Sequence, residues 1–327
     1  MTWRRLFQAA DSAFSTTERL QFAGANISVL APFLLMTLTR QTLCKVNLLL
    51  NILGKRADGF HELETVLQPV PVCDELQFKR GGPNIELTCN HPSLPVDSTN
   101  LVHRAAAAFS RAAPCSEGVR IHLEKRLPLA AGLGGGSANA ANTLLGLNEL
   151  FSEPLTAGQL EDIAAALGSD VPFFLQNQPA LAIGRGEKIT PLDFFPALRG
   201  VFILLIHPGF GISTAWAYQA LARHPEALNG RPGRAQKLVS LLQNGDLGAA
   251  TNEFCNSLEA PVLNKYPLLE LFQEFLKANG AAAAMMSGSG STTFALVRGQ
   301  NAAEQLRENF QAKFGENHWM ALVPLGA

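Results

Sequence analysis

The chain is organised around a glycine-rich stretch at residues 127–143, Leu-Pro-Leu-Ala-Ala-Gly-Leu-Gly-Gly-Gly-Ser-Ala-Asn-Ala-Ala-Asn-Thr. Residues with little or no side chain leave backbone N–H groups uncovered. The Ser-Ala-Asn-Ala-Ala run after them favours a helix start with Ser137 as its N-cap. Backbone donors at the positive end of a helix dipole attract phosphate oxygens. The stretch therefore predicts a phosphate-binding loop, and the alternative is a tight strand-to-helix turn without a ligand.

Two widespread phosphate-binding patterns do not match this chain. A Walker loop requires Gly-Lys followed by Ser or Thr, but the only Gly-Lys pair is Gly54-Lys55 and Arg56 follows it. The dinucleotide pattern G-x-G-x-x-G fails because Ser137 takes its last place. No acidic residue ends a plausible second strand about 20 residues later. A different kind of phosphate loop is needed.

Length and composition limit the class of protein. The 327 residues are 47% hydrophobic and 16% charged, which is enough for a large core and indicates two domains. A net charge of -1 argues against partners such as nucleic acid or an acidic membrane surface. The 5 cysteines are scattered, odd in number and without a C-x-x-C pair. They favour a reducing, cytoplasmic compartment over a disulfide framework or a zinc site.

The first 36 residues differ from the rest of the chain. Arg4 and Arg5 precede an apolar stretch at 27–38, but acidic residues lie between them and Pro32 interrupts the apolar run. A signal peptide, a membrane span and a chloroplast transit peptide all fit poorly. Met36 lies nine residues before Lys45. We expect residues 1–36 to be an extension that is either non-native or poorly ordered.

Apolar periodicity predicts the elements that follow. We expect an alternation of strands with helices that place the glycine stretch between a strand and a helix. Thr156 and Gln159 form a predicted capping box, Gly168 a predicted left-handed helix stop, and Asp97 or Ser98 the cap of an earlier helix. Strands are predicted at about 44–53, 64–70, 75–78, 85–89, 119–123, 180–189 (a pair), 201–206, 281–286, up to 297, and 319–323. Helices are predicted at about 99–112, up to 150, 156–167, 213–223, 235–243, 247–254, 267–279 and 302–314.

Three segments could carry chemistry. Lys45 and Asn47 share one face of a predicted strand, from which they could reach a cleft, although the solvated face of an edge strand is the simpler interpretation. Asp170 lies between a helix end and an apolar Val-Pro-Phe-Phe run, which predicts partial desolvation unless the carboxylate caps a turn. The glycine-flanked loop at 54–61 brings Phe60 and His61 into a polar segment, where function often concentrates.

Taken together, these segments resemble the GHMP kinases. Residues 128–138 match that family's phosphate loop, Pro-x-x-x-Gly-Leu-Gly-[Ser/Gly]-[Ser/Gly]-Ser-[Ala/Ser], at the right spacing. From about residue 43 to the end, the other family segments follow in order: Lys45-Val-Asn-Leu, Gly54-Lys-Arg-Ala-Asp-Gly-Phe-His61, Leu167-Gly-Ser-Asp-Val-Pro-Phe173, His207-Pro-Gly209 and Ser287-Gly-Ser-Gly290. The family binds ATP through a loop unrelated to the Walker loop.

The resemblance implies an α+β fold of two domains with the ATP and substrate cleft between them. It divides the chain into the extension 1–36, an N-terminal domain at 37–192 and a C-terminal α+β domain at 193–327. ATP would bind through the phosphate loop with Mg²⁺, whose protein ligands the sequence does not identify. The residues assigned to the ATP phosphates are Pro128, Leu129, Ala130, Ala131, Gly132, Leu133, Gly134, Gly135, Gly136, Ser137 and Ala138.

The implied reaction moves the γ-phosphate of ATP to the tertiary 2-hydroxyl of 4-diphosphocytidyl-2-C-methyl-D-erythritol, in non-mevalonate isoprenoid synthesis. Asp170 matches the catalytic base and Lys45 its partner, which would keep the carboxylate ionised and offset charge on the transferred group. Further positions match the family's substrate contacts. His61 would read the cytosine edge, Phe60 and Tyr218 would sandwich the ring, and Asn47 and Thr214 would lie near the substrate diphosphate.

Departures from the family pattern are small. Ala130 and Ala131 stand where glycine is frequent, and we expect a negative φ at both. Cys44 replaces a usual alanine, and Phe60 replaces a common tyrosine, which keeps ring stacking and loses a hydroxyl.

Two alternatives to the implied function stay open. One is another small-molecule GHMP kinase, which would not need a cytosine pocket, and the other is a non-catalytic nucleotide-binding relative, which would not need both Lys45 and Asp170. A small-molecule substrate is expected, with the protein a monomer or a weak homodimer.

Overall fold

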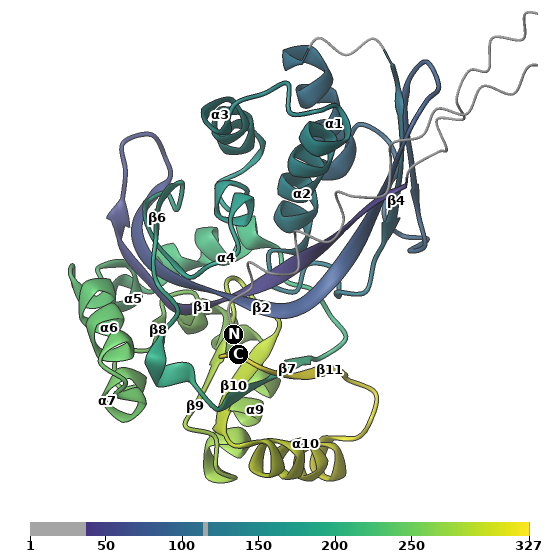
Figure 1. The fold of residues 1–327 in the computed structure, drawn as a ribbon. Coiled ribbons are helices and arrows are strands. Elements are labelled where there is room, and N and C mark those ends of the chain that lie inside the picture. The colour runs from purple at the N-terminus through teal and green to yellow at the C-terminus, as the bar shows by residue number, and fades with distance from the viewer. Residues whose placement is uncertain (1–36, 114–116, 327) are drawn as a thin grey trace, which may run out of the picture. The chain divides into compact units, whose positions relative to one another are not determined.

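The computed structural model describes residues 37–113 and 117–326, which form one compact unit. The expectation for residues 1–36 lies outside the described residues. Two β-sheets organise the unit, and Figure 1 shows helices on the outer side of each sheet. No helix in the described part of the chain combines the length and apolar character needed to cross a membrane.

The larger sheet has seven strands in the order β3-β4-β2-β1-β8, with β5 beside β2 and β6 beside β5. Its two long central strands pair antiparallel along most of their length. On its other side β1 pairs with β8 only at Leu49 and Leu50. Lys45 is nevertheless buried, at 4% exposed, so the interpretation of its face as the solvated face of an edge strand is wrong. The strands are β1 (Leu38–Lys55), β2 (His61–Arg80), β3 (Ile85–Cys89), β4 (Val119–Glu124), β5 (Ala180–Gly184), β6 (Lys188–Pro191) and β8 (Cys255–Asn256).

β2 is one continuous strand where the sequence predicted two. Val70 pairs with Cys44 and Cys73 pairs with Leu43, so Pro71 and Val72 between them have no partner on β1. Pro71 cannot donate a ladder hydrogen bond, and a β-bulge accommodates it so that the strand continues beyond it. The proline interrupts the pairing without ending the strand.

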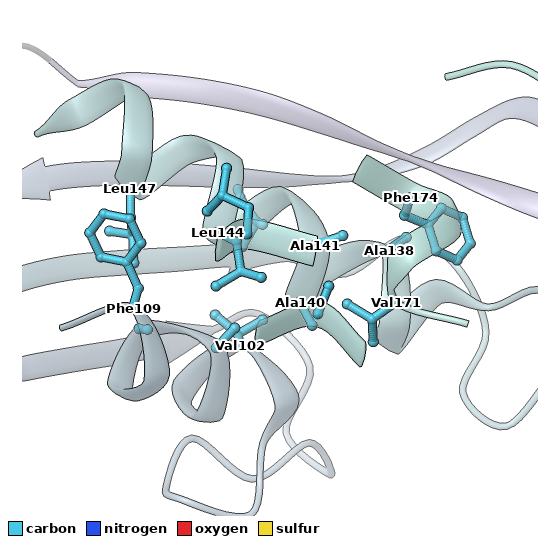
Figure 2. Packing of buried hydrophobic residues seen from close by; sticks show 14 of the residues in the cluster. Val102, Phe109, Ala138, Ala140, Ala141, Leu144, Leu147, Val171 and Phe174 are labelled. Atoms are coloured by element: carbon cyan, nitrogen blue, oxygen red, sulfur yellow. The ribbon is translucent and has the colours of Figure 1, made fainter. Parts of the chain in front are cut away.

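Three helices cover one face of the larger sheet: α1 (Leu101–Ala112), α2 (Gly135–Leu150) and α3 (Ala157–Leu167). α2 is buried nearly all round, and its small residues let it pack closely against α1 and against the single turn of 3₁₀ helix at Pro172–Leu175. Figure 2 shows Ala140 and Leu144 of α2 beside Val102 of α1, and Ala138 beside Phe174. This tight packing fixes the start of α2, where the glycine stretch ends.

The helix ends confirm some sequence signals and correct others. The predicted capping box of Thr156 and Gln159 opens α3. α1 starts later than predicted, because the Asn100 side chain, not that of Asp97 or Ser98, accepts a hydrogen bond from the Val102 N–H at 2.8 Å. Gly168 ends α3 with a φ of 168°, which is extended backbone and not the predicted left-handed stop.

The smaller sheet has the order β11-β7-β10-β9, with antiparallel pairing throughout. One face packs against β1 and β2 through a shared apolar cluster, and the other packs against α9 and α10. Figure 1 shows the resulting order of layers: α1–α3, larger sheet, smaller sheet, and α9 with α10. The strands are β7 (Val201–His207), β9 (Ala283–Met286), β10 (Thr293–Arg298) and β11 (Trp319–Pro324).

Most helices of the second half lie where periodicity placed them. α7 is shorter than predicted, and β8, α5 and α8 were not predicted. The division at residues 192 and 193 falls between β6 and β7 and stays a prediction. The helices are α4 (Thr214–Ala220), α5 (Pro225–Leu228), α6 (Arg234–Gln243), α7 (Leu247–Thr251), α8 (Glu259–Lys265), α9 (Pro267–Ala278) and α10 (Gln300–Phe314).

Candidate functional site

The glycine-rich stretch forms a loop that lies directly on a second small-residue loop, after β9. The Ser287 hydroxyl donates to the Gly132 carbonyl at 3.0 Å, and the Thr292 N–H donates to the Ala131 carbonyl at 3.1 Å. Gly132 has a φ of +77°, and a Cβ there would lie 2.0 Å from the Ser287 carbonyl oxygen. Only glycine fits this combination of positive φ and close approach.

The start of α2 differs from the prediction. The N-cap is Gly134, with a φ of 70°, and Ser137 lies inside the first turn. No side chain caps this helix end. The first N–H groups of α2 are therefore not taken by a capping side chain, and residues 134–137 line a cavity. This arrangement suits an anion better than a side-chain cap would, because the helix dipole and the N–H groups act together.

Ala130 contradicts the expectation of a negative φ, since its φ is +49°. For a residue with a Cβ this backbone costs on the order of 1–2 kcal/mol. Tertiary contacts hold it there: the Ala130 carbonyl accepts from the Ile212 N–H at 3.2 Å, and its Cβ lies over Gly211. The neighbouring segment before α4 therefore selects the conformation of the loop.

Lys45 and Asp170 come together beside the loop. The Lys45 Nζ lies 3.9 Å from the Asp170 Oδ2, and it donates to the Asn47 Oδ1 at 2.6 Å and to the Gly132 carbonyl at 3.2 Å. The Lys45 side chain is 5% exposed, whereas that of Asp170 is 46% exposed. Burial lowers the pKa of Lys45, and the nearby Asp170 carboxylate partly opposes that shift. A buried ammonium thus contacts the loop and a half-exposed carboxylate at once.

Two cavities open around this pair. The loop cavity, of about 620 Å³, is lined by the glycine loop, Lys45, Asn47 and the Ser289 region. The aromatic cavity, of about 800 Å³, is lined by Phe60, His61, Tyr218 and their neighbours. Among the described residues lining either cavity, Asp170 is the one carboxylate. The residues that line both cavities are Leu63, Ser137, Asp170, Arg185, Thr214 and Tyr218.

The predicted cytosine contacts gather at the aromatic cavity. The His61 and Tyr218 rings lie 5.3 Å apart between centroids with a tilt of 35°, and Phe60 is 52% exposed. Desolvation, followed by the charge of Lys55, lowers the pKa of His61, so its imidazole is neutral near pH 7 and offers one donor and one acceptor. Burial, with a smaller contribution from Asp170, raises the pKa of Tyr218.

The two predicted diphosphate contacts lie at different places. Asn47 lines the loop cavity only, where its Nδ2 donates to the Thr65 hydroxyl at 2.9 Å. Thr214 lines both cavities, and its hydroxyl shares a hydrogen bond of 2.8 Å with the Ser289 hydroxyl. The second small-residue loop therefore contributes to the same site as α4.

The sequence interpretation missed several polar residues at the site. Lys125 lines the loop cavity and forms a buried ion pair with Asp74, whose carboxylate also accepts from the N–H groups of Arg126 and Leu127. Asn256 donates to the carbonyls of Met286 and Gly288, at 2.9 and 2.8 Å. The only available signal was their polarity within apolar surroundings, which does not identify a partner far along the chain.

Comparisons with known proteins identify the family of this chain. The family model "GHMP kinases N terminal domain" matches residues 100–178, and "GHMP kinases C terminal" matches residues 228–316. A 4-diphosphocytidyl-2-C-methyl-D-erythritol kinase of Synechococcus sp. (strain JA-3-3Ab) is 41% identical over 290 residues, covering 86% of this chain and 93% of that protein. The kinase of the same name from Gloeobacter violaceus is 42% identical over 270 residues, covering 82% and 88%.

Solved structures give the same result. A crystal structure of 4-(cytidine 5'-diphospho)-2C-methyl-D-erythritol kinase is 34% identical and superposes with a TM-score of 0.74, covering 88% of this chain and 100% of the other. The mevalonate kinase of L. major is 16% identical with a TM-score of 0.65, covering 89% and 98%. The second likeness shows a shared fold only.

Proposed function

The chain belongs to the GHMP kinase family, and on that premise we propose that it transfers the γ-phosphate of ATP to the 2-hydroxyl of 4-diphosphocytidyl-2-C-methyl-D-erythritol. One observation carries the proposal: two cavities meet at Asp170, one lined by the glycine loop and the other by Phe60, His61 and Tyr218. The first suits a triphosphate and the second a nucleobase, with a carboxylate between them.

Asp170 is the proposed general base. A tertiary alcohol is a weak nucleophile near pH 7, and a positioned carboxylate that takes its proton contributes roughly 10²–10⁴-fold to the rate. Lys45, whose ammonium lies 3.9 Å from that carboxylate, would offset negative charge on the transferred phosphoryl group. Because Lys45 also donates to the Gly132 carbonyl, it ties the base to the phosphate loop.

The glycine loop is the proposed ATP phosphate site. Backbone N–H groups in the first turn of α2 would hold the triphosphate in line with the acceptor hydroxyl, so that the reaction gains from orientation. Mg²⁺ is proposed to accompany ATP, where it would neutralise phosphate charge. In kinase and ATPase sites Mg²⁺ is generally bound by substrate phosphates with one or two protein carboxylates.

Substrate recognition is proposed to use residues that line the aromatic cavity and residues that line the loop cavity. His61 would hydrogen-bond the cytosine edge as a neutral imidazole, while Phe60 and Tyr218 would contact the ring faces. Asn47 and Thr214 would contact the substrate diphosphate.

The described cysteines are free thiols, which supports a reducing compartment such as the cytoplasm. A monomer or weak homodimer remains the proposed assembly.

The test is ADP release by the purified protein with ATP, Mg²⁺ and the cytidylated methylerythritol, run beside mevalonate, homoserine and galactose. Turnover confined to the cytidylated substrate supports the proposal. Turnover only with another alcohol would keep the kinase activity and remove the cytosine site. Absence of turnover with all four, together with ATP binding, would leave a nucleotide-binding protein without this reaction.

A further inference from the structure

Arg185 lies at the junction of the two cavities, in the turn between β5 and β6. Gly184 and Gly186 flank it, and the pairing of Gly184 with Leu63 brings the turn to the beginning of β2. Phe60 and His61 lie at that same beginning, so the register of β5 on β2 places Arg185 beside the aromatic residues. Nothing in the predicted site assigns this residue a role.

The Arg185 side chain contacts its neighbours, but these contacts do not use all of its hydrogen-bond donors. Its guanidinium carbon lies 4.6 Å from the centroid of the Phe60 ring, and its Nε lies 3.9 Å from the Glu187 carboxylate. That carboxylate also accepts from the Arg185 backbone N–H at 2.6 Å, so it is partly engaged by the turn itself. The side chain remains 37% exposed. A guanidinium has five donors, and this arrangement leaves several for a ligand.

The other cationic side chains at the site contact other partners or line only one of the two cavities. The Lys45 ammonium donates to Asn47 and Gly132 beside Asp170, and Lys125 is paired with Asp74 in the protein interior. Lys55 lines the aromatic cavity only. Arg185 is therefore the one cationic side chain, among the described residues, that reaches both cavities.

We propose that Arg185 binds the diphosphate of the cytidylated substrate and so determines the specificity of the protein for that substrate. This inference rests on the proposed function. If cytosine occupies the aromatic cavity and the acceptor hydroxyl lies at Asp170, the diphosphate that joins them crosses the region shared by the two cavities. The planar guanidinium fork can donate two parallel hydrogen bonds to two phosphate oxygens, a geometry that a lysine ammonium lacks. Contact with Phe60 would hold the fork in place before substrate arrives.

The experiment compares Arg185→Gln and Arg185→Lys with the wild-type protein. Calorimetry without ATP measures binding of cytidine 5'-diphosphate and of cytidine, and steady-state kinetics measure KM for each substrate. For Arg185→Gln we expect KM for the cytidylated substrate and Kd for cytidine 5'-diphosphate to rise about 10- to 100-fold. The Kd for cytidine and KM for ATP stay within about twofold, because neither ligand loses the charged contact. Arg185→Lys should fall between, since it keeps the charge and loses the fork.

Arg120→Gln is the matched control. Arg120 is 55% exposed on β4, pairs with Glu86, and lines neither cavity. This variant should bind every ligand as the wild type does. Equal weakening of cytidine and cytidine 5'-diphosphate in Arg185→Gln would instead assign Arg185 to support of the Phe60 ring and overturn the diphosphate role.

Unchanged binding in Arg185→Gln would also overturn the inference while leaving the proposed function intact. If the wild-type protein itself neither binds nor turns over the cytidylated substrate, the proposed function fails, and the role of Arg185 fails with it.

Discussion

The Lys45 ammonium lies 3.9 Å from the Asp170 carboxylate, with the lysine buried and the aspartate half-exposed. The two residues come from β1 and from the turn after α3. Their difference in exposure gives them different tasks: a buried cation with fixed donors, and a carboxylate that a substrate can reach. The first two predictions follow from this pair.

Replacement of Asp170 by Asn removes the proposed base and keeps the shape of the side chain. We expect kcat to fall about 10²–10⁴-fold, because the amide cannot accept the hydroxyl proton. ATP affinity and the unfolding transition should be unchanged. Steady-state ADP release, nucleotide titration and urea denaturation measure these quantities, and near-normal turnover would place the base elsewhere.

The lowered pKa of Lys45 predicts an alkaline loss of activity. Burial disfavours the charged form, so the residue loses its proton at a pH below the ordinary lysine value of 10.5. We expect kcat to fall as pH rises through that lowered pKa. In the window between the two values the unfolded chain binds the proton and the native protein does not, so this residue makes the free energy of unfolding rise with pH.

A pH–rate profile of Lys45→Arg checks the assignment. Arginine stays charged throughout this range, so the alkaline decline should disappear even if kcat is lower overall. An alkaline decline of the same midpoint in the arginine variant would assign the titration to another group.

Substitutions at Tyr218 distinguish the contribution of its ring from that of its hydroxyl. Its ring lies 5.3 Å from His61, and its raised pKa keeps the hydroxyl neutral over the working pH range. Tyr218→Phe should therefore retain cytidine affinity, whereas Tyr218→Ala should weaken it by about 1–3 kcal/mol. Phe194→Ala, at a residue that is 64% exposed and lines neither cavity, is the control. Cytidine titration measures all three, and an unaffected Tyr218→Ala would remove the residue from the cytosine site.

Gly132→Ala should abolish ATP binding at the loop. The new Cβ would lie 2.0 Å from the Ser287 carbonyl oxygen at a φ of +77°, so the two loops must separate. Gly158→Ala is the matched control, since a Cβ there meets nothing within 4 Å on the helix α3. Nucleotide titration and thermal unfolding report the two effects, and normal ATP affinity in Gly132→Ala would show that loop contact is dispensable.

The buried Lys125–Asp74 pair predicts a large stability effect. Asp74→Ala leaves the buried ammonium unpaired and two backbone N–H groups without acceptors, at a cost of about 3–5 kcal/mol. Glu86→Ala breaks the exposed pair with Arg120 and should cost less than about 1 kcal/mol. Urea unfolding of both variants measures the difference, and equal effects would contradict the buried-pair argument.

Local patterns were enough to predict much of the fold and site. Alternation put Lys45 and Asn47 on one face of β1, and Thr156 with Gln159 opened α3 as expected. The glycine run led to the start of α2, and the family segments led to Asp170 and the aromatic residues. Such features depend on the conformations of a few adjacent residues, which nearby side chains largely determine.

The remaining features depend on residues far apart in the chain, for which local periodicity carries no signal. Contact with the segment before α4 holds Ala130 at a positive φ, and the Ser287 carbonyl makes glycine necessary at position 132. The register of β5 on β2 brings Arg185 to Phe60, and the fold buries Lys125 against Asp74. The amino-acid sequence thus specifies the proposed reacting groups. Strand pairing and loop contact set the distances between them, because those distances exist only after distant segments have packed.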